Sequence, residues 1–132
     1  MKAKILQPPN WPRPKGYANG ISATGRMVFA SGMVGWDAQG KLVSRDFVEQ
    51  ARQALQNIVA VLTEGGAKPE HLVRLIWFVV DKKEYLSVFP ELGKVYRAVI
   101  GNHYPAMTAV EVSGLLEDGA RVEIEATAVV PE

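Results

Sequence analysis

The clearest hydrophobic pattern in the chain lies in residues 46–66 and predicts a helix. Its apolar residues are Phe47, Ala51, Ala54, Leu55, Ile58, Val61 and Leu62. They recur every three or four positions, which places them on one face of an α-helix. Asp46, followed three residues later by Glu49, resembles a capping box at the helix start. Gly65-Gly66 then predicts the helix end.

A second helical pattern covers residues 89–100. Its apolar residues are Phe89, Leu92, Tyr96, Val99 and Ile100. Pro90 fits the first turn of a helix, where a backbone N–H is not needed, and Gly101-Asn102 follow the predicted end. We therefore expect two amphipathic helices, separated in sequence by strand-forming residues.

Three segments after the first helix predict β-strands. Residues 72–80, LVRLIWFVV, form a nearly continuous apolar run, which is typical of a central strand covered on both faces. Residues 105–112 and 121–130 are rich in alternating apolar side chains and predict two more strands. In the first of these two, alternation places Met107 and Ala109 on the same face.

Weaker strand signals lie near the N-terminus. Residues 18–23 and 27–31 flank Thr24-Gly25-Arg26, and this spacing predicts a β-hairpin. Residues 33–36 predict a short further strand. The predicted order along the chain is therefore β-β-(β)-α-β-α-β-β.

This order indicates an α+β fold. Its most economical arrangement is one mixed six-stranded sheet with two helices packed on one face. The other face is also apolar, because either Trp77 or Phe78 must point away from the helices, and we expect oligomerisation to cover it. The 132 residues suit one domain, residues 1–132, in which four prolines favour an extended N-terminal arm over residues 1–15.

Composition excludes several classes of function. The chain has no cysteine, so disulfides, thiolate metal sites and cysteine nucleophiles are excluded. Its two histidines, His71 and His103, lack the spacing of metal ligands, and we expect neither a metal nor a cofactor. No apolar run approaches the roughly 20 residues that span a bilayer, and the N-terminus lacks the core of a signal peptide. We therefore expect a cytoplasmic protein without a membrane partner.

The net charge of +1 argues against general nucleic-acid binding. Basic residues nevertheless precede the first acidic one: they are Lys2, Lys4, Arg13, Lys15 and Arg26. Such a basic arm could contact RNA or another anion. The alternative is a solvated segment without a binding role.

Several motifs occur together along the chain. They are Lys15-Gly16-Tyr17, Phe29-Ala30-Ser31-Gly32, the helical Gln50, Ala54-Leu55 and Asn57-Ile58, Pro105-Ala106, and Val122-Glu123-Ile124-Glu125-Ala126. Together they resemble the RidA/YjgF family, also called L-PSP, over residues 15–130. The resemblance implies a chorismate-mutase-like fold and a homotrimer with a central β-barrel. It also implies a small-molecule cleft at each subunit interface and cofactor-free hydrolysis of reactive imines and enamines.

The resemblance also assigns roles to individual residues. Tyr17 matches the family's cleft tyrosine, and Ser31 and Gly32 match the segment that lines the cleft. Glu123 matches the acidic residue that holds the attacking water, so we expect Glu123 and Tyr17 to be the catalytic residues. Taken alone, the pair Glu123 and Glu125 is typical of a solvated strand face.

One position departs from the family pattern. The family's arginine, which binds the substrate carboxylate, follows the Pro-Ala pair, and here Met107 stands there. Ala109 stands where some members carry a cysteine, and Phe89 lies near the position of a polar cleft residue. The cleft should be less polar, because methionine suits an aryl or alkyl group better than a charged one. We expect a changed substrate, bound by Ser31, Gly32, Phe89, Met107 and Ala109.

The sequence leaves three functions open. The first is hydrolysis of an enamine or imine that differs from the substrates of typical family members. The second is a non-catalytic trimer that binds a small metabolite. The third, endoribonuclease activity or translation inhibition, is supported only by the basic arm. Another arginine, such as Arg74, could replace the missing positive charge.

Overall fold

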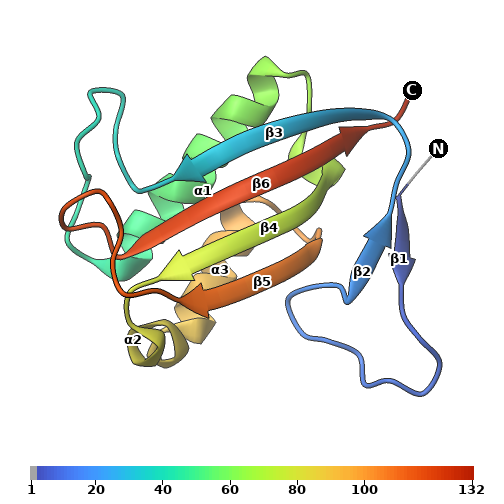
Figure 1. The fold of residues 1–132 in the computed structure, drawn as a ribbon, viewed down its shortest axis with the longest axis horizontal. Coiled ribbons are helices and arrows are strands. Elements are labelled where there is room, and N and C mark those ends of the chain that lie inside the picture. Colours follow the sequence, from blue (N-terminus) through green and yellow to red (C-terminus); the bar gives the residue numbers. More distant parts are fainter. Residues whose placement is uncertain (1–2) are drawn as a thin grey trace.

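The main sheet has four strands rather than six. In the computed structural model, which describes residues 3–132, the strand order is β3 (Arg26–Met33), β6 (Val122–Val130), β4 (Leu72–Val79) and β5 (Ala106–Glu111). β4 pairs with β5 in parallel and the other neighbours are antiparallel (Figure 1). The sheet is mixed and the fold is α+β, as predicted, but the predicted six-stranded sheet is wrong.

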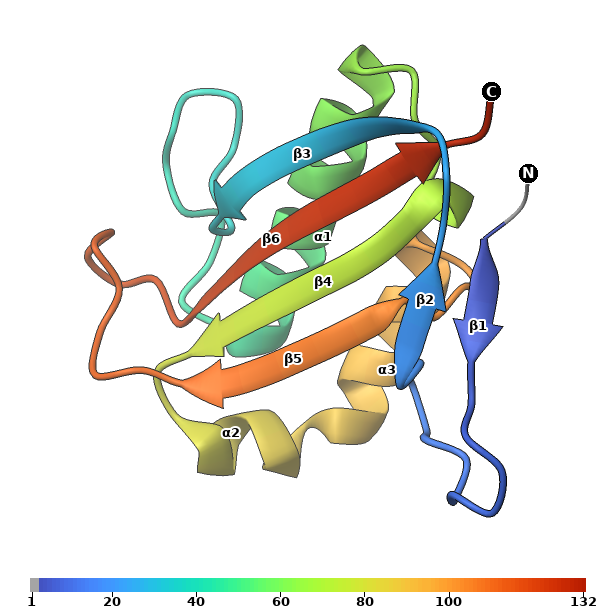
Figure 2. The same ribbon diagram turned by 45° about the vertical axis from the view of Figure 1, so that its right-hand side comes forward.

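Two further strands form a separate hairpin. β1 (Lys4–Leu6) pairs antiparallel with β2 (Gly20–Ser22), next to the end of the main sheet where β5 begins (Figure 2). The predicted hairpin between residues 18–23 and 27–31 is therefore wrong. Gly25 explains this, because it has a φ of +151° and a Cβ there would lie 2.2 Å from the carbonyl oxygen of Val130. This close approach directs the chain along β6 instead of back onto β2.

The remaining N-terminal predictions are met in part. β3 continues to Met33, so residues 33–36 contain no strand of their own, and Trp36 forms only an isolated bridge with Leu42. The arm predicted over residues 1–15 contains β1. Lys2 of the basic arm lies outside the described residues.

Two helices cover one face of the sheet, as the hydrophobic pattern predicts. α1 (Phe47–Glu64) and α3 (Phe89–Val99) pack against each other on that face (Figure 1). The side chain of Asp46 caps α1 by accepting a hydrogen bond from the N–H of Glu49, at 3.0 Å. The N–H of Gly65 donates to carbonyl groups of the last turn. The predicted start and end of this helix are therefore confirmed.

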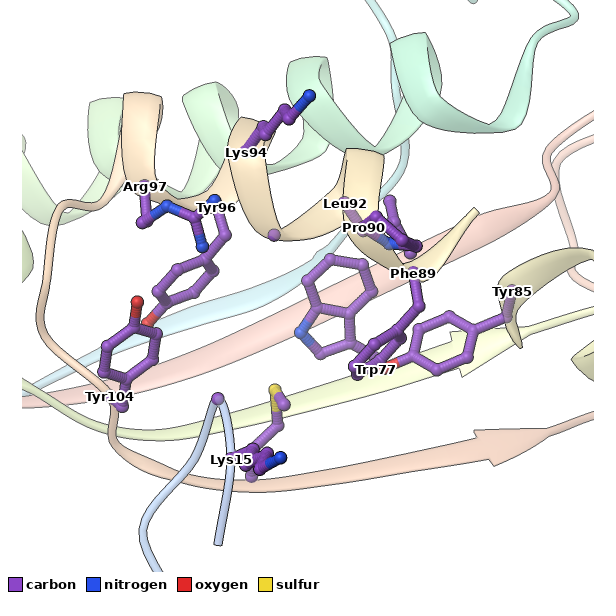
Figure 3. A pocket seen from close by; sticks show the side chains of 13 residues that line it. Lys15, Trp77, Tyr85, Phe89, Pro90, Leu92, Lys94, Tyr96, Arg97 and Tyr104 are labelled. Atoms are coloured by element: carbon purple, nitrogen blue, oxygen red, sulfur yellow. The ribbon is translucent and has the colours of Figure 1, made fainter. Parts of the chain in front are cut away.

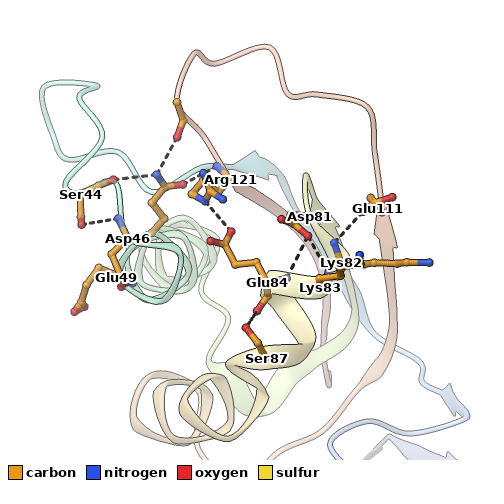
Figure 4. Close-up of polar contacts among 12 residues, drawn as sticks. Ser44, Asp46, Glu49, Asp81, Lys82, Lys83, Glu84, Ser87, Glu111 and Arg121 are labelled. Carbon is orange, nitrogen blue, oxygen red and sulfur yellow. Dashed lines mark hydrogen bonds and ion pairs between the residues drawn. The ribbon is translucent and has the colours of Figure 1, made fainter.

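The hydrophobic pattern does not predict two shorter helices. α2 (Lys82–Ser87) begins at Asp81, whose carboxylate accepts hydrogen bonds from the N–H groups of Lys83 and Glu84 (Figure 4). A 3₁₀ helix, η1 (Pro69–His71), leads into β4. None of the helices in residues 3–132 is long and apolar enough to cross a membrane.

The core lies between the helices and the sheet. Its largest fully buried side chains include Leu55, Ile58, Leu62, Leu75 and Ile124. Gln50 is also fully buried, and its amide donates to the carbonyl oxygens of Ser44 and Gly119 at 2.9 and 3.0 Å. Its side-chain oxygen accepts from the N–H of Arg121, whose guanidinium also pairs with Glu84 at 2.7 Å (Figure 4). These contacts fix the loops around the beginning of β6.

The other face of the sheet is apolar and exposed. On this outer face, Phe29 and Met27 of β3 are 64% and 57% exposed, and Val110 of β5 is 41% exposed. Phe78 points to this side, because its neighbour Trp77 is buried against the helices. An apolar face of this kind is what oligomerisation would bury.

Candidate functional site

A pocket opens between α3 and the strands β4 and β5. Its volume is about 400 Å³. Its wall is mostly aromatic and includes Trp77, Tyr85, Phe89, Tyr96 and Tyr104 (Figure 3). Met107 also lines it. Two of the predicted substrate-binding residues, Phe89 and Met107, therefore lie in the same pocket, which we call the aromatic pocket.

The strand register places Met107 in the aromatic pocket. Met107 lies opposite Leu75 of β4, which is fully buried against the helices, so both side chains point to the helical side of the sheet. Arg74 precedes Leu75, is exposed and points to the outer face. Within one chain, Arg74 therefore does not supply the charge that Met107 lacks. Ala109 is exposed on the edge strand β5 and does not line the pocket.

Two stacked tyrosines close one end of the pocket. The rings of Tyr96 and Tyr104 have centroids 5.4 Å apart. The hydroxyl of Tyr96 donates to the carbonyl oxygen of His103. Burial, and to a lesser extent the neighbouring Tyr104, raises the pKa of Tyr96. Tyr96 therefore forms a fixed, neutral wall at physiological pH.

The aromatic pocket is bordered by cations. Among residues 3–132, Lys15, Lys94 and Arg97 line it and no acidic side chain does. Figure 3 shows Arg97 turned toward the tyrosine wall, whereas Lys94 points away from the pocket. The ring nitrogen of Trp77, Nε1, is buried and has no hydrogen-bond partner in the described part of the chain. The pocket thus has positive charge at its border, and one of its lining residues carries a buried N–H without an acceptor.

A second group of predicted site residues lies on the outer face. Glu123 of β6 is half-buried and packs against Gly32 of β3, since a Cβ on Gly32 would lie 2.2 Å from Oε2 of Glu123. Ser31 is the exposed neighbour of Gly32. The structure therefore brings Ser31, Gly32 and Glu123 together, on the side of the sheet opposite Met107.

Tyr17 lies apart from both groups. It lines a smaller cavity between the N-terminal arm and the loop before β5, together with Arg13, Tyr104 and other residues. Tyr104 also lines the aromatic pocket, so the two cavities adjoin. Glu123 lines neither of them. A single chain does not bring the two predicted catalytic residues together.

Apart from Phe89, the sequence does not assign the aromatic wall or its cations to a site. In the sequence, Trp77 is more simply interpreted as a core or interface residue. Arg97 lies on a predicted amphipathic helix, and the apolar pattern of that helix does not indicate that Arg97 borders a pocket. Two signals pointed to this region. Tyr104 directly precedes the Pro105-Ala106 motif, and Lys15 belongs to the motif that ends in Tyr17.

Known proteins share this arrangement of elements. The sequence profile of the family described as Endoribonuclease L-PSP matches residues 11–130. A RutC family protein of Pyrococcus abyssi is 31% identical over 129 residues, which cover 97% of this chain and 98% of that protein. The chain belongs to the RidA/YjgF/L-PSP family.

Other members of the RidA family match it in length and fold. The 2-iminobutanoate/2-iminopropanoate deaminase of Salmonella typhimurium is 34% identical over 116 residues, covering 86% of each chain. The crystal structure of YyfB, a Rid family protein from Yersinia pestis, superposes with a TM-score of 0.85 at 29% identity. That match covers 98% of this chain and 100% of YyfB. The fold is therefore of the YjgF, chorismate-mutase-like type.

The structure also bears on metals and on the basic arm. In residues 3–132, no group of three or more His, Cys, Asp or Glu side chains could hold a metal ion. Arg26 of the arm donates to the carbonyl oxygen of Gly65 at 2.6 Å, and Lys15 lines the aromatic pocket. Arg26 therefore contacts the C-terminal end of α1, whereas Lys15 lies at the aromatic pocket.

Proposed function

We propose that this RidA family protein hydrolyses reactive imines or enamines to ketones and ammonia, in clefts between the subunits of a homotrimer. The packing of the Glu123 carboxylate against Gly32, on an exposed apolar face, carries this proposal. A carboxylate in this position can hold a water molecule on a surface that a second chain would enclose. The name of the Salmonella relative, an imine deaminase, supports the same chemistry.

A second chain is needed because the site residues lie on opposite sides of the sheet. Glu123 and Gly32 belong to the outer face, whereas Met107 and Phe89 belong to the aromatic pocket at the β5 edge. In the proposed trimer, the outer face of one chain meets the β5 edge of the next, and three outer faces enclose the central barrel. Burial of Phe29 and similar side chains there would contribute about 1.5–3 kcal/mol each.

The proposed reaction uses only water and protons. Glu123 accepts a proton from the water as its oxygen attacks the carbon of the C=N bond, so a C–O bond forms and the nitrogen takes up a proton. In the resulting carbinolamine, Glu123 takes the hydroxyl proton and passes it to the amino nitrogen, the C–N bond breaks as the C=O bond forms, and ammonia leaves the ketone. Tyr17 donates a hydrogen bond to the substrate or the water.

Met107 changes the substrate rather than the reaction. A charge-assisted hydrogen bond contributes about 1.5–3 kcal/mol, so the absence of arginine here weakens binding of a small α-imino acid roughly 10- to 100-fold. The methionine and the aromatic wall instead favour an aryl or bulky alkyl group. We therefore propose a substrate larger and more apolar than 2-iminopropanoate.

The test measures ammonia release from imines that an amino acid oxidase produces in situ, with semicarbazide present to trap free imine. The wild-type protein should accelerate ammonia release and compete with trapping for amino acids with large apolar side chains. Glu123→Gln should abolish the acceleration. Glu125→Gln, two residues along the same strand, is the matched control and should retain it. If no imine is hydrolysed while the Salmonella deaminase works in parallel, the proposal is wrong.

A second candidate is a trimer that binds a metabolite without converting it. The methionine at position 107 and the aromatic wall favour this alternative, because binding needs neither Glu123 nor water. It predicts a ligand that raises the melting temperature of the protein but is not consumed. Glu123→Gln would then leave ligand binding unchanged.

A further inference from the structure

The aromatic pocket has a polar end and an apolar end. In Figure 3, Arg97 and Tyr104 lie at one end, Tyr85 and Phe89 lie at the other, and Trp77 lies between them. The ring of Tyr85 meets those of Trp77 and Phe89 edge to face, with centroids 6.1 and 5.5 Å away. Burial raises the pKa of Tyr85, so this end stays uncharged at neutral pH. It suits an aromatic ring or a branched alkyl group.

The polar end has an unpaired cation. The ion pairs formed within residues 3–132 join Arg52 to Glu49 and Arg121 to Glu84, and Arg97 takes part in neither. No acidic side chain of these residues lines the pocket. The guanidinium of Arg97 is therefore available to bind an anion, and guanidinium groups bind carboxylates in a planar, two-point geometry.

Trp77 provides a second, independent indication of a ligand. Its side chain is 3% exposed, and its Nε1–H has no acceptor among the described residues. A buried donor without an acceptor is unfavourable, and such groups commonly mark functional positions. Figure 3 shows the nitrogen edge of the ring facing the end of the pocket where Arg97 lies. Nε1 is buried in this structure, so an acceptor reaches it only when a side chain lining the pocket moves.

We infer that the aromatic pocket binds a carboxylate that carries an aromatic or bulky apolar group. Arg97 and Nε1 of Trp77 donate to the carboxylate, and the apolar group lies between Met107 and Phe89. This inference rests on the proposed function, since it names the substrate class of the same cleft.

Isothermal titration calorimetry on the full chain tests this directly with three probes. They are 3-phenylpropanoate, propanoate, which lacks the ring, and 3-phenylpropanamide, which lacks the charge. The wild-type protein should bind 3-phenylpropanoate at least tenfold more tightly than either of the others. Equal affinity for the acid and the amide would overturn the proposed carboxylate site.

Variants then identify the groups that bind the carboxylate. Arg97→Met should weaken 3-phenylpropanoate binding at least tenfold and leave the amide unchanged. Lys83→Met is the matched control, because it removes a charge from the neighbouring helix α2 that lines neither cavity, and it should have no effect. Trp77→Phe keeps an aromatic ring but removes the N–H, and it should also weaken binding of the acid. An effect of Lys83→Met equal to that of Arg97→Met would contradict a specific contact.

Failure of this inference can be distinguished from failure of the proposed function. If 3-phenylpropanoate does not bind but imines of amino acids with large apolar side chains are hydrolysed, the proposed function holds and this inference is wrong. If the probe binds as expected but no imine is hydrolysed, the binding site is supported and the proposed hydrolysis is wrong.

Discussion

The two faces of the sheet differ in how they are covered, although both are apolar. On the helical face, Leu75 and Ile124 are fully buried by α1 and α3 of the same chain. On the outer face, Phe29 is 64% exposed and no element of the main fold covers it (Figures 1 and 2). The helical face is thus covered within one chain, whereas the outer face of one chain remains open.

The candidate site follows the same division. Met107 and Phe89 lie in a formed pocket on the helical side, and Glu123, Gly32 and Ser31 lie on the open outer face. Binding and catalysis would therefore come from different copies of the chain. Mutations on the helical side should therefore act within one chain, whereas mutations on the outer face should act on contacts between chains.

The largest effect should come from the outer face. Glu123→Gln removes the proposed base, and general base catalysis contributes about 100- to 10,000-fold, so ammonia release should fall by a factor in that range. The melting temperature should change little, because the substitution keeps the size of the side chain. Steady-state ammonia release checks this, with Glu125→Gln as the control. A less than tenfold loss would remove Glu123 from the mechanism.

The next prediction contrasts the two faces in stability. Leu75→Ala on the helical face should cost about 2–5 kcal/mol of unfolding free energy at any protein concentration, because it leaves a cavity in the core. Phe29→Ala on the outer face should destabilise the protein in a concentration-dependent manner, since it acts on assembly. Urea unfolding at several protein concentrations, with analytical ultracentrifugation, measures both. A monomeric wild-type protein would contradict the proposed trimer.

A smaller effect should come from Gly32→Ala. The new Cβ would lie 2.2 Å from Oε2 of Glu123, so the carboxylate must move, and we expect roughly tenfold lower activity. The backbone of Gly32 has no positive φ, so the fold should tolerate alanine. Gly114→Ala is the control, because a Cβ there has open space. Equal activities of the two variants would argue against a role for the contact between Glu123 and Gly32.

The smallest effect concerns the wall of the aromatic pocket. Tyr96→Phe removes the hydrogen bond to His103 and should cost about 0.5–1.5 kcal/mol at pH 7. Because burial raises the folded-state pKa of Tyr96 above its ordinary value of 10.0, the folded chain retains this proton longer than the unfolded chain. The contribution of this proton to the free energy of unfolding is therefore fully present below pH 10 and is lost as the pH rises toward the folded-state pKa.

Unfolding experiments between pH 9 and 11 test the second part of this prediction. A difference of one bound proton between the folded and unfolded chains changes the free energy of unfolding by up to about 1.4 kcal/mol per pH unit. Tyr96→Phe removes this difference, so the free energy of unfolding should fall less steeply at alkaline pH in the variant. Parallel slopes for the variant and the wild-type protein would show that Tyr96 does not titrate differently in the two states.

Local patterns explain what the sequence predicts correctly. Asp46 caps α1 as predicted, and the apolar run of β4 marks a central strand, because both features depend on residues close in sequence. α2 also depends on a local feature, since Asp81, which directly follows the predicted strand 72–80, caps this six-residue helix. Short helices with no buried residue leave no hydrophobic pattern to recognise.

Long-range contacts explain what the sequence does not predict. The hairpin prediction failed because Gly25 packs against Val130, more than a hundred positions away, and this contact directs the chain along β6. The aromatic pocket is a second example. Its lining residues Lys15, Trp77 and Arg97 come from a loop, a strand and a helix that are far apart in sequence, and only the tertiary fold brings them to one cavity. The family resemblance, by contrast, predicts a site that includes Glu123 and Gly32, and the structure places these two residues in contact.

The most direct test of the central claim is complementation between two inactive variants. Met107→Trp should fill the aromatic pocket, and Glu123→Gln should disable the outer face, so each homotrimer should be inactive. In trimers refolded from an equal mixture, about one quarter of the clefts would combine an intact pocket with an intact Glu123 from the neighbouring chain. We predict recovery of ammonia release to about that fraction of the wild-type rate. No recovery, in mixed trimers confirmed by mass spectrometry, would contradict a site shared between chains.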